Sequence, residues 1–251
     1  DELDSGKAGG KKGGLSYKVP HEGAGQVVLV GPPNSGKSSL LAALTNAHPA
    51  IAPYPYTTRT PQPGLMAWQD VGVQLVDLPP ISHDMMEPWV PSIIRGADAA
   101  LLVADLSSDD VADQILAALE RLEQVHTELV GALPFDNEDE AVRHLPTLLV
   151  ANKVDAEGAS DRLEILGEFL GERFPMLAVS AESGSELDVL RSRTYDLLGV
   201  IRVYTKAPGK PADRSHPFTL PRGSTVLELA RAIHRDLEHS LKHARIWGTG
   251  V

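Results

Sequence analysis

GPPNSGKS, at residues 31–38, is the stretch from which the expected fold of this 251-residue chain follows. The apolar run QVVLV at 26–30 precedes it, and SLLAAL at 39–44 comes directly after it. This order predicts a buried strand, a glycine-bracketed loop and a helix, the context in which G-x-x-x-x-G-K-[S/T] has chemical meaning. The backbone N–H groups of such a loop, with the positive end of the helix, can cradle a polyphosphate. We therefore predict a phosphate-binding loop in an α/β fold.

The polar residues of this loop have expected roles toward a nucleotide. Lys37 would reach the outer phosphates, and the Ser38 hydroxyl would ligate Mg²⁺. Gly31 and Gly36 permit a close approach that a Cβ would obstruct. The alternative, a glycine-rich turn without a ligand, is disfavoured by the flanking strand and helix. The loop residues expected to contact the nucleotide are Gly31, Pro33, Asn34, Ser35, Gly36, Lys37, Ser38 and Ser39.

The composition is that of a globular protein. Apolar residues make up 42% of the chain, enough for a packed core. The absence of cysteine excludes disulfides and thiolate metal sites and fits a cytoplasmic protein. No apolar run approaches the roughly 18 residues of a membrane span, and no signal-peptide pattern opens the sequence, so no membrane association is expected. The chain begins at Asp1, which suggests a trimmed form of a longer one.

Charge is unevenly distributed along the chain. The net charge of −11 argues against a protein coated for nucleic acid. Residues 1–200 carry 14 basic and 30 acidic side chains, a net −16, whereas residues 201–251 carry 9 and 4, a net +5. Such a change of sign indicates a second unit with a different partner. The expected division is a Gly- and Lys-rich linker at 1–24, an α/β domain at 25–200 and a second domain at 201–251.

A segment rich in proline and threonine, PYPYTTRTP, occupies residues 53–61. It contains too much proline for a helix or a central strand. Folds of this kind keep a mobile segment here that senses the γ-phosphate through a Thr on Mg²⁺, and we prefer Thr58 over Thr57 for that role. The alternative is a plain loop.

Two strands are expected next, at 64–68 and 73–77, joined by a turn. The second ends at Asp77, and an acid at the C-terminal end of a strand in an α/β sheet lies beside the ligand crevice. Asp77 is therefore expected to hold Mg²⁺ through water, with a helix cap as the alternative.

The middle of the chain predicts further core elements. A fully buried strand is expected at 99–105, followed by a helix that turns Val111, Ile115, Leu119 and Leu122 to one face. The stretch 131–144 is interpreted as an acidic, solvated loop without a metal role.

A strand at 148–151 leads into Asn152-Lys153-Val154-Asp155, the pattern that guanine recognition requires. The Asp155 carboxylate can accept from N1–H and the 2-amino group, a pair that adenine lacks, so adenine would leave it unsatisfied. Asn152 would join the base site to the phosphate loop, and the Lys153 stem would cover one face of the ring. The tetrapeptide comes about 115 residues after the phosphate loop and on its own strand, which makes it a specific signal.

The last core strand is expected at 176–181. It ends in Ser180 and Ala181, a pair whose backbone commonly meets the guanine O6. A helix is expected to start at Ser183 or Ser185.

The final segment differs in kind. It predicts a strand at 202–206, a polar loop at 207–215 and a capping box at 225–228 that opens a helix. Trp247 is expected in the core, with a stacking platform as the alternative. The basic residues of this helix contact RNA phosphates in one interpretation and form a solvated face in the other. The residues expected on the inward face of the helix are Val226, Leu229, Ala230, Ile233, Leu237 and Leu241.

Together these motifs resemble the Obg-related translation-factor GTPases, most closely the developmentally regulated GTP-binding protein branch. YPYTTRTP at 54–61 is similar to the first switch of that family, and residues 204–248 are similar to its TGS domain. The resemblance covers nearly the whole chain. It implies a Ras-like G domain, a P-loop NTPase fold with a mainly parallel sheet and helices on both faces, and then a small β-grasp TGS domain that this chain leaves incomplete. It also implies association with a ribosome or RNA.

Pro80 departs from the family pattern. The family has D-x-P-G where this sequence has Asp77-Leu78-Pro79-Pro80, and the N–H of that glycine, which binds the γ-phosphate, has no counterpart in proline. Losing one hydrogen bond to a charged group is worth about 1.5–3 kcal/mol, roughly tenfold to over a hundredfold in affinity or rate. Ile81 stands where Ras-type enzymes place a water-orienting Gln, although an apolar residue there is normal for Obg relatives.

Asn34 matches the loop position at which potassium-activated relatives place an Asn that helps to coordinate K⁺ beside the phosphates. The alternative is an Asn that caps the loop. The expected catalytic residues are thus Lys37, Thr58 and Asn34, and the expected metal ligands are Ser38, Thr58 and Asp77; no general base is assigned.

The sequence as a whole predicts a GTP-binding protein, a slow Mg²⁺-dependent GTPase that acts as a switch. Its TGS segment would bind a ribosome or RNA and a regulatory protein. Two alternatives stay open. One is a scaffold that binds GTP or GDP but does not hydrolyse GTP because of Pro80, and the other is an RNA-binding module led by residues 201–251.

Overall fold

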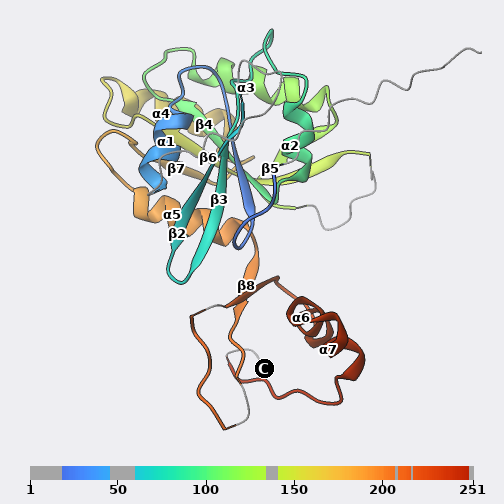
Figure 1. Ribbon diagram of the computed structural model, residues 1–251. Helices are drawn as coiled ribbons and strands as arrows, with labels where there is room; N and C mark the ends of the chain where they lie inside the picture. The colour runs from blue at the N-terminus through green and yellow to red at the C-terminus, as the bar shows by residue number, and fades with distance from the viewer. Residues whose placement is uncertain (1–18, 46–59, 134–140, 207–208, 216, 249–251) are drawn as a thin grey trace, which may run out of the picture.

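The computed structural model of the chain describes residues 19–45, 60–133, 141–206, 209–215 and 217–248. It comprises an α/β domain and a smaller unit formed by the C-terminal part of the chain (Figure 1). Within the described residues, no helix is long and apolar enough to cross a membrane.

The α/β domain is built from alternating strands and helices. Its strands are β1 (Gln26–Val30), β2 (Gln62–Trp68), β3 (Val71–Asp77), β4 (Ala99–Asp105), β5 (Thr127–Val130), β6 (Arg143–Asn152) and β7 (Met176–Ala178). Its helices are α1 (Lys37–Leu44), α2 (Val90–Gly96), α3 (Val111–Glu123), α4 (Ala159–Leu170) and α5 (Leu187–Leu197).

The strands form a seven-stranded, mainly parallel sheet in the order β2-β3-β1-β4-β6-β5, with β7 also paired to β6. Within this sheet, β2–β3 is the only antiparallel pair among the described strands. Because β1, β3, β4 and β6 run in parallel, their C-terminal ends meet at one edge of the sheet. The loop after β1 lies at this edge, together with Asp77, Asp105 and Asn152, which end β3, β4 and β6.

Helices cover both faces of this sheet, as predicted. One buried cluster joins the sheet to α2, α3 and α4, and the other joins it to α1 and α5. The strands β1 and β4 are buried along their whole length, which is why they read as unbroken apolar runs. The expected inward face of α3 is also confirmed, since Val111, Ile115, Leu119 and Leu122 are all at most 2% exposed.

Some elements begin or end away from the predicted positions. β7 stops at Ala178 because the chain then turns, with the Ser180 N–H donating to the Ser185 carbonyl oxygen. The following helix, α5, begins at Leu187 and not at Ser183 or Ser185. The elements α2, α4 and β5 were not expected, and β5 occupies the stretch just before the predicted acidic loop.

The segment at 19–24, expected as the end of a linker, packs against the α/β domain. Val19 is buried in the cluster that contains α2, and its carbonyl oxygen accepts from Gln26 Nε2 at 3.2 Å. The Ala24 N–H donates to the Gly72 carbonyl oxygen at 2.7 Å. This part of the chain therefore belongs to the folded domain.

The C-terminal unit consists of the antiparallel pair β8 (Val200–Val203) and β9 (Phe218–Pro221) with α6 (Val226–Ile233) and α7 (Arg235–Ser240). The strand β9 falls after the predicted polar loop and was not expected. The predicted capping box is present, because the Thr225 side chain accepts from the Glu228 N–H while the Glu228 carboxylate accepts from the Thr225 N–H. The predicted single helix is wrong, since His234 is extended and separates α6 from α7.

The predicted inward face of this helix is only partly buried, since Val226, Leu229 and Leu241 are half-buried. Only Ala230 is buried on α6, while Ile233 and Leu237 are 38% and 37% exposed. Trp247, expected in the core, is 67% exposed, and Lys206 Nζ lies 5.2 Å from the centre of its ring. The described sheet of this unit has two strands, which cover little of the apolar surface of α6.

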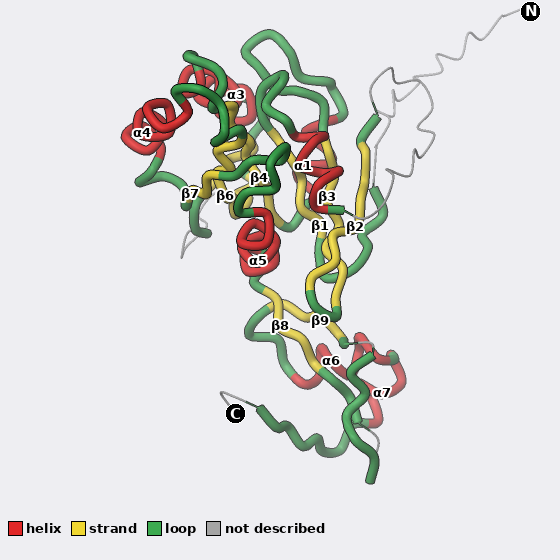
Figure 2. The backbone as a smooth tube through the Cα atoms, turned by 90° about the vertical axis from the view of Figure 1, so that its left-hand side faces the viewer, coloured by secondary structure: helices red, strands yellow, loops and turns green. Residues whose placement is uncertain are grey.

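Asp70, in the turn between β2 and β3, connects the two units. Figure 2 shows this turn of the hairpin close to the C-terminal unit. The Asp70 carboxylate accepts from Arg202 Nη1 and from the Tyr204 hydroxyl, each at 2.6 Å. The Arg202 guanidinium also lies over the Tyr195 ring of α5, 5.4 Å from its centre. The C-terminal unit is therefore held against the tip of the β2–β3 hairpin and the end of α5.

Candidate nucleotide-binding site

The phosphate-binding loop joins β1 to α1, as its sequence predicts. Gly31 has φ +148 and Gly36 has φ +89, both in the region that favours glycine. A Cβ on Gly31 would lie 2.4 Å from the Val103 carbonyl oxygen, and one on Gly36 would lie 2.2 Å from Asn152 Nδ2. The two glycines thus allow the loop to approach β4 on one side and the Asn152 side chain on the other.

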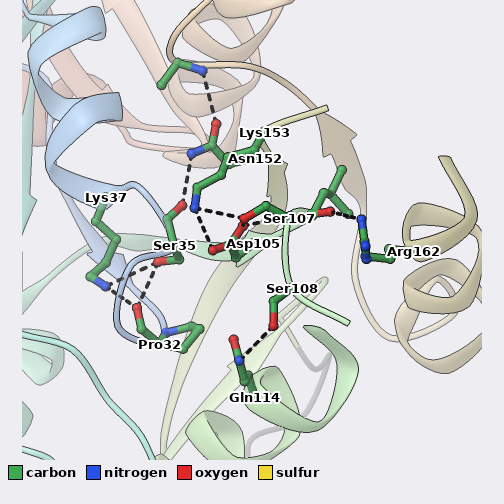
Figure 3. Close-up of polar contacts among 12 residues, drawn as sticks. Pro32, Ser35, Lys37, Asp105, Ser107, Ser108, Gln114, Asn152, Lys153 and Arg162 are labelled. Carbon is green, nitrogen blue, oxygen red and sulfur yellow. Dashed lines mark hydrogen bonds and ion pairs between the residues drawn. The ribbon is translucent and has the colours of Figure 1, made fainter. Parts of the chain in front are cut away.

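Lys37 points into this loop, as Figure 3 shows. Its Nζ donates to the carbonyl oxygens of Gly31 and Pro32, at 3.1 and 2.7 Å, and lies 3.3 Å from Ser35 Oγ. Burial lowers the pKa of Lys37 from 10.5 to about 8, although the charge of Asp77 acts in the opposite direction. The loop therefore holds a cation beside backbone N–H groups, an arrangement suited to an anionic ligand.

Asp77 and Ser38 meet on the other side of the loop. The Ser38 hydroxyl donates to Asp77 Oδ2 at 2.5 Å, while Asp77 Oδ1 is buried without a hydrogen-bond partner among the described residues. Burial raises the pKa of Asp77, and the Ser38 hydrogen bond and the charge of Lys37 oppose that rise. A buried, unpaired carboxylate oxygen next to a hydroxyl is a donor set that fits Mg²⁺, which prefers such oxygen ligands.

Asn152 links the phosphate loop to the segment that is predicted to border the base. Its Nδ2 donates to the Ser35 carbonyl oxygen at 2.9 Å, and its Oδ1 accepts from the Ala181 N–H at 3.1 Å. The side chain is 1% exposed, so these contacts fix its orientation. One residue therefore brings together three segments that are far apart in the sequence.

Asp155 is exposed near Ser180, and a hydrogen bond from Ser180 lowers the pKa of its carboxyl group. The Ser180 Oγ in turn accepts from the Ser183 N–H at 3.0 Å. The backbone N–H groups of Ser180 and Ala181 both donate to protein oxygens, those of Ser185 and Asn152. A base oxygen at this place would therefore compete with Asn152 for the Ala181 N–H.

Lys153 makes a contact that was not predicted from the sequence. Its Nζ lies 2.6 Å from Asp105 Oδ2 and 3.2 Å from Ser107 Oγ (Figure 3). Asp105 ends β4 in the same way that Asp77 ends β3, and the rule that selected Asp77 applies to it equally. An acidic residue at the C-terminal end of a strand was thus visible at both positions, but a role was predicted for Asp77 only.

Pro80 and Ile81 follow Asp77 at the edge of the sheet. The Ile81 N–H donates to the Gly31 carbonyl oxygen at 3.0 Å, and the Ile81 side chain is fully buried in the core that contains Trp89 and Val90. Ile81 therefore contributes to packing. The backbone at Pro80 has no N–H to offer, as the sequence requires.

The remaining predicted site residues are placed as follows. Pro33 and Asn34 are exposed in the loop, and Asn34 has φ +60, a conformation that Asn tolerates better than most residues. Ser39 is exposed on α1. Thr57 and Thr58 lie outside the described residues.

Comparison with known proteins agrees with this geometry. Residues 26–153 match the family described as 50S ribosome-binding GTPase, and residues 201–251 match the TGS domain. The chain is 28% identical to Developmentally-regulated G-protein 1 of Arabidopsis thaliana, covering 97% of this chain and 74% of the relative. It is also 28% identical to GTP-binding protein 1 of Schizosaccharomyces pombe, covering 95% and 79%. A GTP-binding protein of Sulfolobus solfataricus, solved with GDP, shares the fold with a TM-score of 0.51 at 20% identity, over 70% of this chain and 52% of the other.

Proposed function

Because the chain belongs to the 50S ribosome-binding GTPase family, as a GTP-binding protein of the developmentally regulated branch with a TGS domain, we propose that it hydrolyses GTP slowly. We further propose that it acts as a ribosome- or RNA-associated switch in the cytoplasm. The observation that carries this proposal is the position of Asn152, whose side chain ties the phosphate loop at Ser35 to Ala181. This contact supports a single site for the phosphates and the base.

At the phosphate end, Lys37 and the loop N–H groups would bind the β- and γ-phosphates. The Nζ of Lys37 now donates to the carbonyl oxygens of Gly31 and Pro32 and would exchange them for phosphate oxygens, a stronger pairing because both partners are charged. As negative charge grows on the phosphate oxygens during attack by water, these donors stabilise it. Gly31, Pro33, Ser35, Gly36 and Ser39 would shape the remainder of this cradle.

Ser38, Asp77 and Thr58 would hold Mg²⁺, and the support for this set is the unpaired Oδ1 of Asp77. When bound, Mg²⁺ offsets the negative charge of the β- and γ-phosphates. Asn34 is proposed as a K⁺ ligand beside them. Hydrolysis rates measured in K⁺ and in Na⁺ test that role, because equal rates would remove it.

At the base end, Asp155 would accept from N1–H and the 2-amino group of guanine, and Lys153 would cover the ring. Ser180 and Ala181 would border the O6 edge. Adenine would leave the Asp155 carboxylate mispaired, which disfavours it strongly. Titration with GDP and ADP tests this proposal, and equal affinities would contradict it.

A second function, a nucleotide-dependent scaffold without turnover, is favoured by one observation. Pro80 offers no N–H where the γ-phosphate would bind, and its neighbour Ile81 uses its own N–H to bind Gly31. Single-turnover hydrolysis should therefore be compared in the parent, Pro80→Gly and Pro80→Ala. Both variants supply a backbone N–H, but only glycine adds flexibility. A hydrolysis rate that rises roughly tenfold or more in both variants therefore identifies the N–H that Pro80 lacks as the cause. Tight GTP binding by the parent without phosphate release favours the scaffold.

The proposed partners of the TGS unit are RNA, as part of a ribosome or free, and a regulatory protein. The support is the net charge of +5 over residues 201–251, against −16 in the remainder. A switch predicts that ribosome or RNA binding differs between the GDP and GTP states. An RNA-binding module predicts instead a strongly salt-dependent affinity that is unchanged in Lys37→Ala.

A further inference from the structure

Asp105 is a buried carboxylate at the base end of the site, to which the proposed function gives no role. It ends β4 in register with Asn152 at the end of β6, and its residue is 5% exposed. Its Oδ1 accepts from the N–H and the hydroxyl of Ser107, at 2.8 and 2.6 Å. Its Oδ2 accepts from Lys153 Nζ at 2.6 Å (Figure 3). Both oxygens are thus engaged, one with a turn and one with the lysine.

The surrounding backbone holds Asp105 in place. The Leu106 N–H donates to the Asn152 carbonyl oxygen at 3.0 Å, and the Ser108 N–H donates to the Asp105 carbonyl oxygen at 3.2 Å. From α4, Arg162 Nη1 donates to the Leu106 carbonyl oxygen at 3.0 Å. The carboxylate is therefore a fixed point beside the Asn152 side chain.

Lys153 by contrast depends on its contacts for its orientation. Its side chain is 33% exposed, and its φ of +66 lies in the left-handed region, which a lysine rarely adopts. Among the described residues, Asp105 and Ser107 are the partners of its Nζ. A long, flexible side chain that is held at its charged end keeps its methylene stem in one position.

The charge state of Asp105 agrees with this arrangement. Burial alone would raise its pKa, but the hydrogen bonds from Lys153 and Ser107 outweigh burial and hold the pKa of the carboxyl below its ordinary value. Asp105 is thus anionic at neutral pH and attracts the ammonium group.

We propose that Asp105 is a positioning residue for guanine-nucleotide binding, which anchors Lys153 so that the lysine stem lies ready over the base. The inference rests on the proposed role of Lys153. It adds a residue outside the Asn152–Asp155 motif, and it accounts for a buried negative charge at the base end of the site. Anchoring a mobile side chain before the ligand arrives increases affinity, because less freedom is lost on binding.

The test is a double-mutant cycle between Asp105 and Lys153, read out as the Kd for GDP. Asp105→Asn keeps the shape of the side chain but presents an amide to the ammonium, and we expect its Kd to rise about tenfold. Lys153→Met keeps an apolar stem without the charge. In the Lys153→Met background, Asp105→Asn should change the Kd by less than about twofold.

Asp109→Asn is the matched control. Asp109 lies in the same loop and pairs with Arg162, but its side chain is 88% exposed and it does not contact Lys153. We expect this variant to bind GDP like the parent. If circular dichroism shows that Asp105→Asn fails to fold, Ser107→Ala replaces it in the cycle. This variant removes a hydroxyl that both orients Asp105 and contacts Lys153 Nζ. A loss of GDP affinity that disappears in the Lys153→Met background then supports the anchoring of Lys153 by Asp105 together with Ser107.

The outcomes separate this inference from the proposed function. A parent that binds GDP no better than ADP contradicts the proposed guanine site. A parent that prefers GDP, with an Asp105→Asn variant of unchanged affinity, overturns only the positioning role. The positioning role is also overturned if Asp105→Asn lowers GDP affinity equally in the parent and in the Lys153→Met background. Asp105 would then act through the stability of the fold.

Discussion

Gly36 and Asn152 lie so close together that a Cβ on Gly36 would be 2.2 Å from Asn152 Nδ2. The first residue belongs to the phosphate loop and the second to the motif proposed to bind the base, so the two segments are in direct contact. Gly36 also has φ +89, which a side chain rarely adopts.

Gly36→Ala is therefore expected to lower the free energy of unfolding by roughly 1–3 kcal/mol. It should also weaken GDP binding, because Asn152 must move away from Ser35. Urea unfolding and GDP titration measure the two effects. Gly96→Ala is the control, since a Cβ there meets nothing within 4 Å; equal effects of both substitutions would contradict the steric argument.

Lys37 gives the stability of the protein a defined pH dependence. Its pKa of about 8 in the folded chain is below the ordinary 10.5, so between these values the unfolded chain binds more protons. The free energy of unfolding therefore rises with pH through this window. Below pH 8 the buried ammonium destabilises the fold, and at pH 10.5 this cost is relieved by up to about 3 kcal/mol.

The measurement is urea unfolding of the parent and of Lys37→Met between pH 7.5 and 10. Other groups titrate in both proteins, so the difference between the two curves isolates Lys37. Parallel curves would show that Lys37 is not responsible for a pH effect.

Ser38→Ala should reduce the part of nucleotide affinity that depends on Mg²⁺. The substitution removes a proposed metal ligand. It also removes the hydroxyl that donates to Asp77 Oδ2 at 2.5 Å. We expect a loss of roughly tenfold in GDP affinity with Mg²⁺ present and little change with EDTA. The control is Ser92→Ala in α2, an exposed residue far along the chain from the site. A loss of equal size in EDTA would point to loop damage instead.

Asp70 is expected to keep the two units together. Asp70→Asn removes the charge that pairs with Arg202 and weakens the acceptor of the Tyr204 hydroxyl. The segment between α5 and β8 should then be cleaved faster in limited proteolysis. Asp188→Asn is the control, because it removes an exposed ion pair with Arg191 within α5 alone.

The pKa of Asp70 sets the pH range in which its carboxylate pairs with Arg202 and Tyr204. The hydrogen bond from Tyr204 is the main cause that lowers the pKa of Asp70, so the contact is present above the ordinary carboxyl pKa of 3.8. It should weaken only as pH falls through the lower, folded-state value. Cleavage that is unchanged in Asp70→Asn would contradict the role of Asp70.

The fold of the α/β domain could be predicted because its strands are continuous apolar runs and its loops carry fixed motifs. The stretches at 26–30 and 99–105 are buried along their whole length, and only a core between two helix layers has that pattern. The glycines and the lysine of the phosphate loop could be predicted because a ligand restricts their types and spacing.

Other features depend on contacts that no local pattern encodes. The pairing of Asp70 with Arg202 spans 132 positions, and that of Lys153 with Asp105 spans 48. The helix at the C-terminal end was overpredicted because its apolar spacing continues past His234, where the backbone is extended. Periodicity indicates which side of a helix is apolar, but burial requires a surface that covers it.

The hairpin of β2 and β3 has a further consequence for communication through the molecule. Its residues pair without interruption from Gln62 and Asp77 at one end to Trp68 and Val71 at the other, about 20 Å apart along a seven-residue strand. One end thus bears a carboxylate of the nucleotide site, and the other bears the anchor of the C-terminal unit. The uninterrupted ladder is thus a direct backbone connection between the nucleotide site and the C-terminal unit.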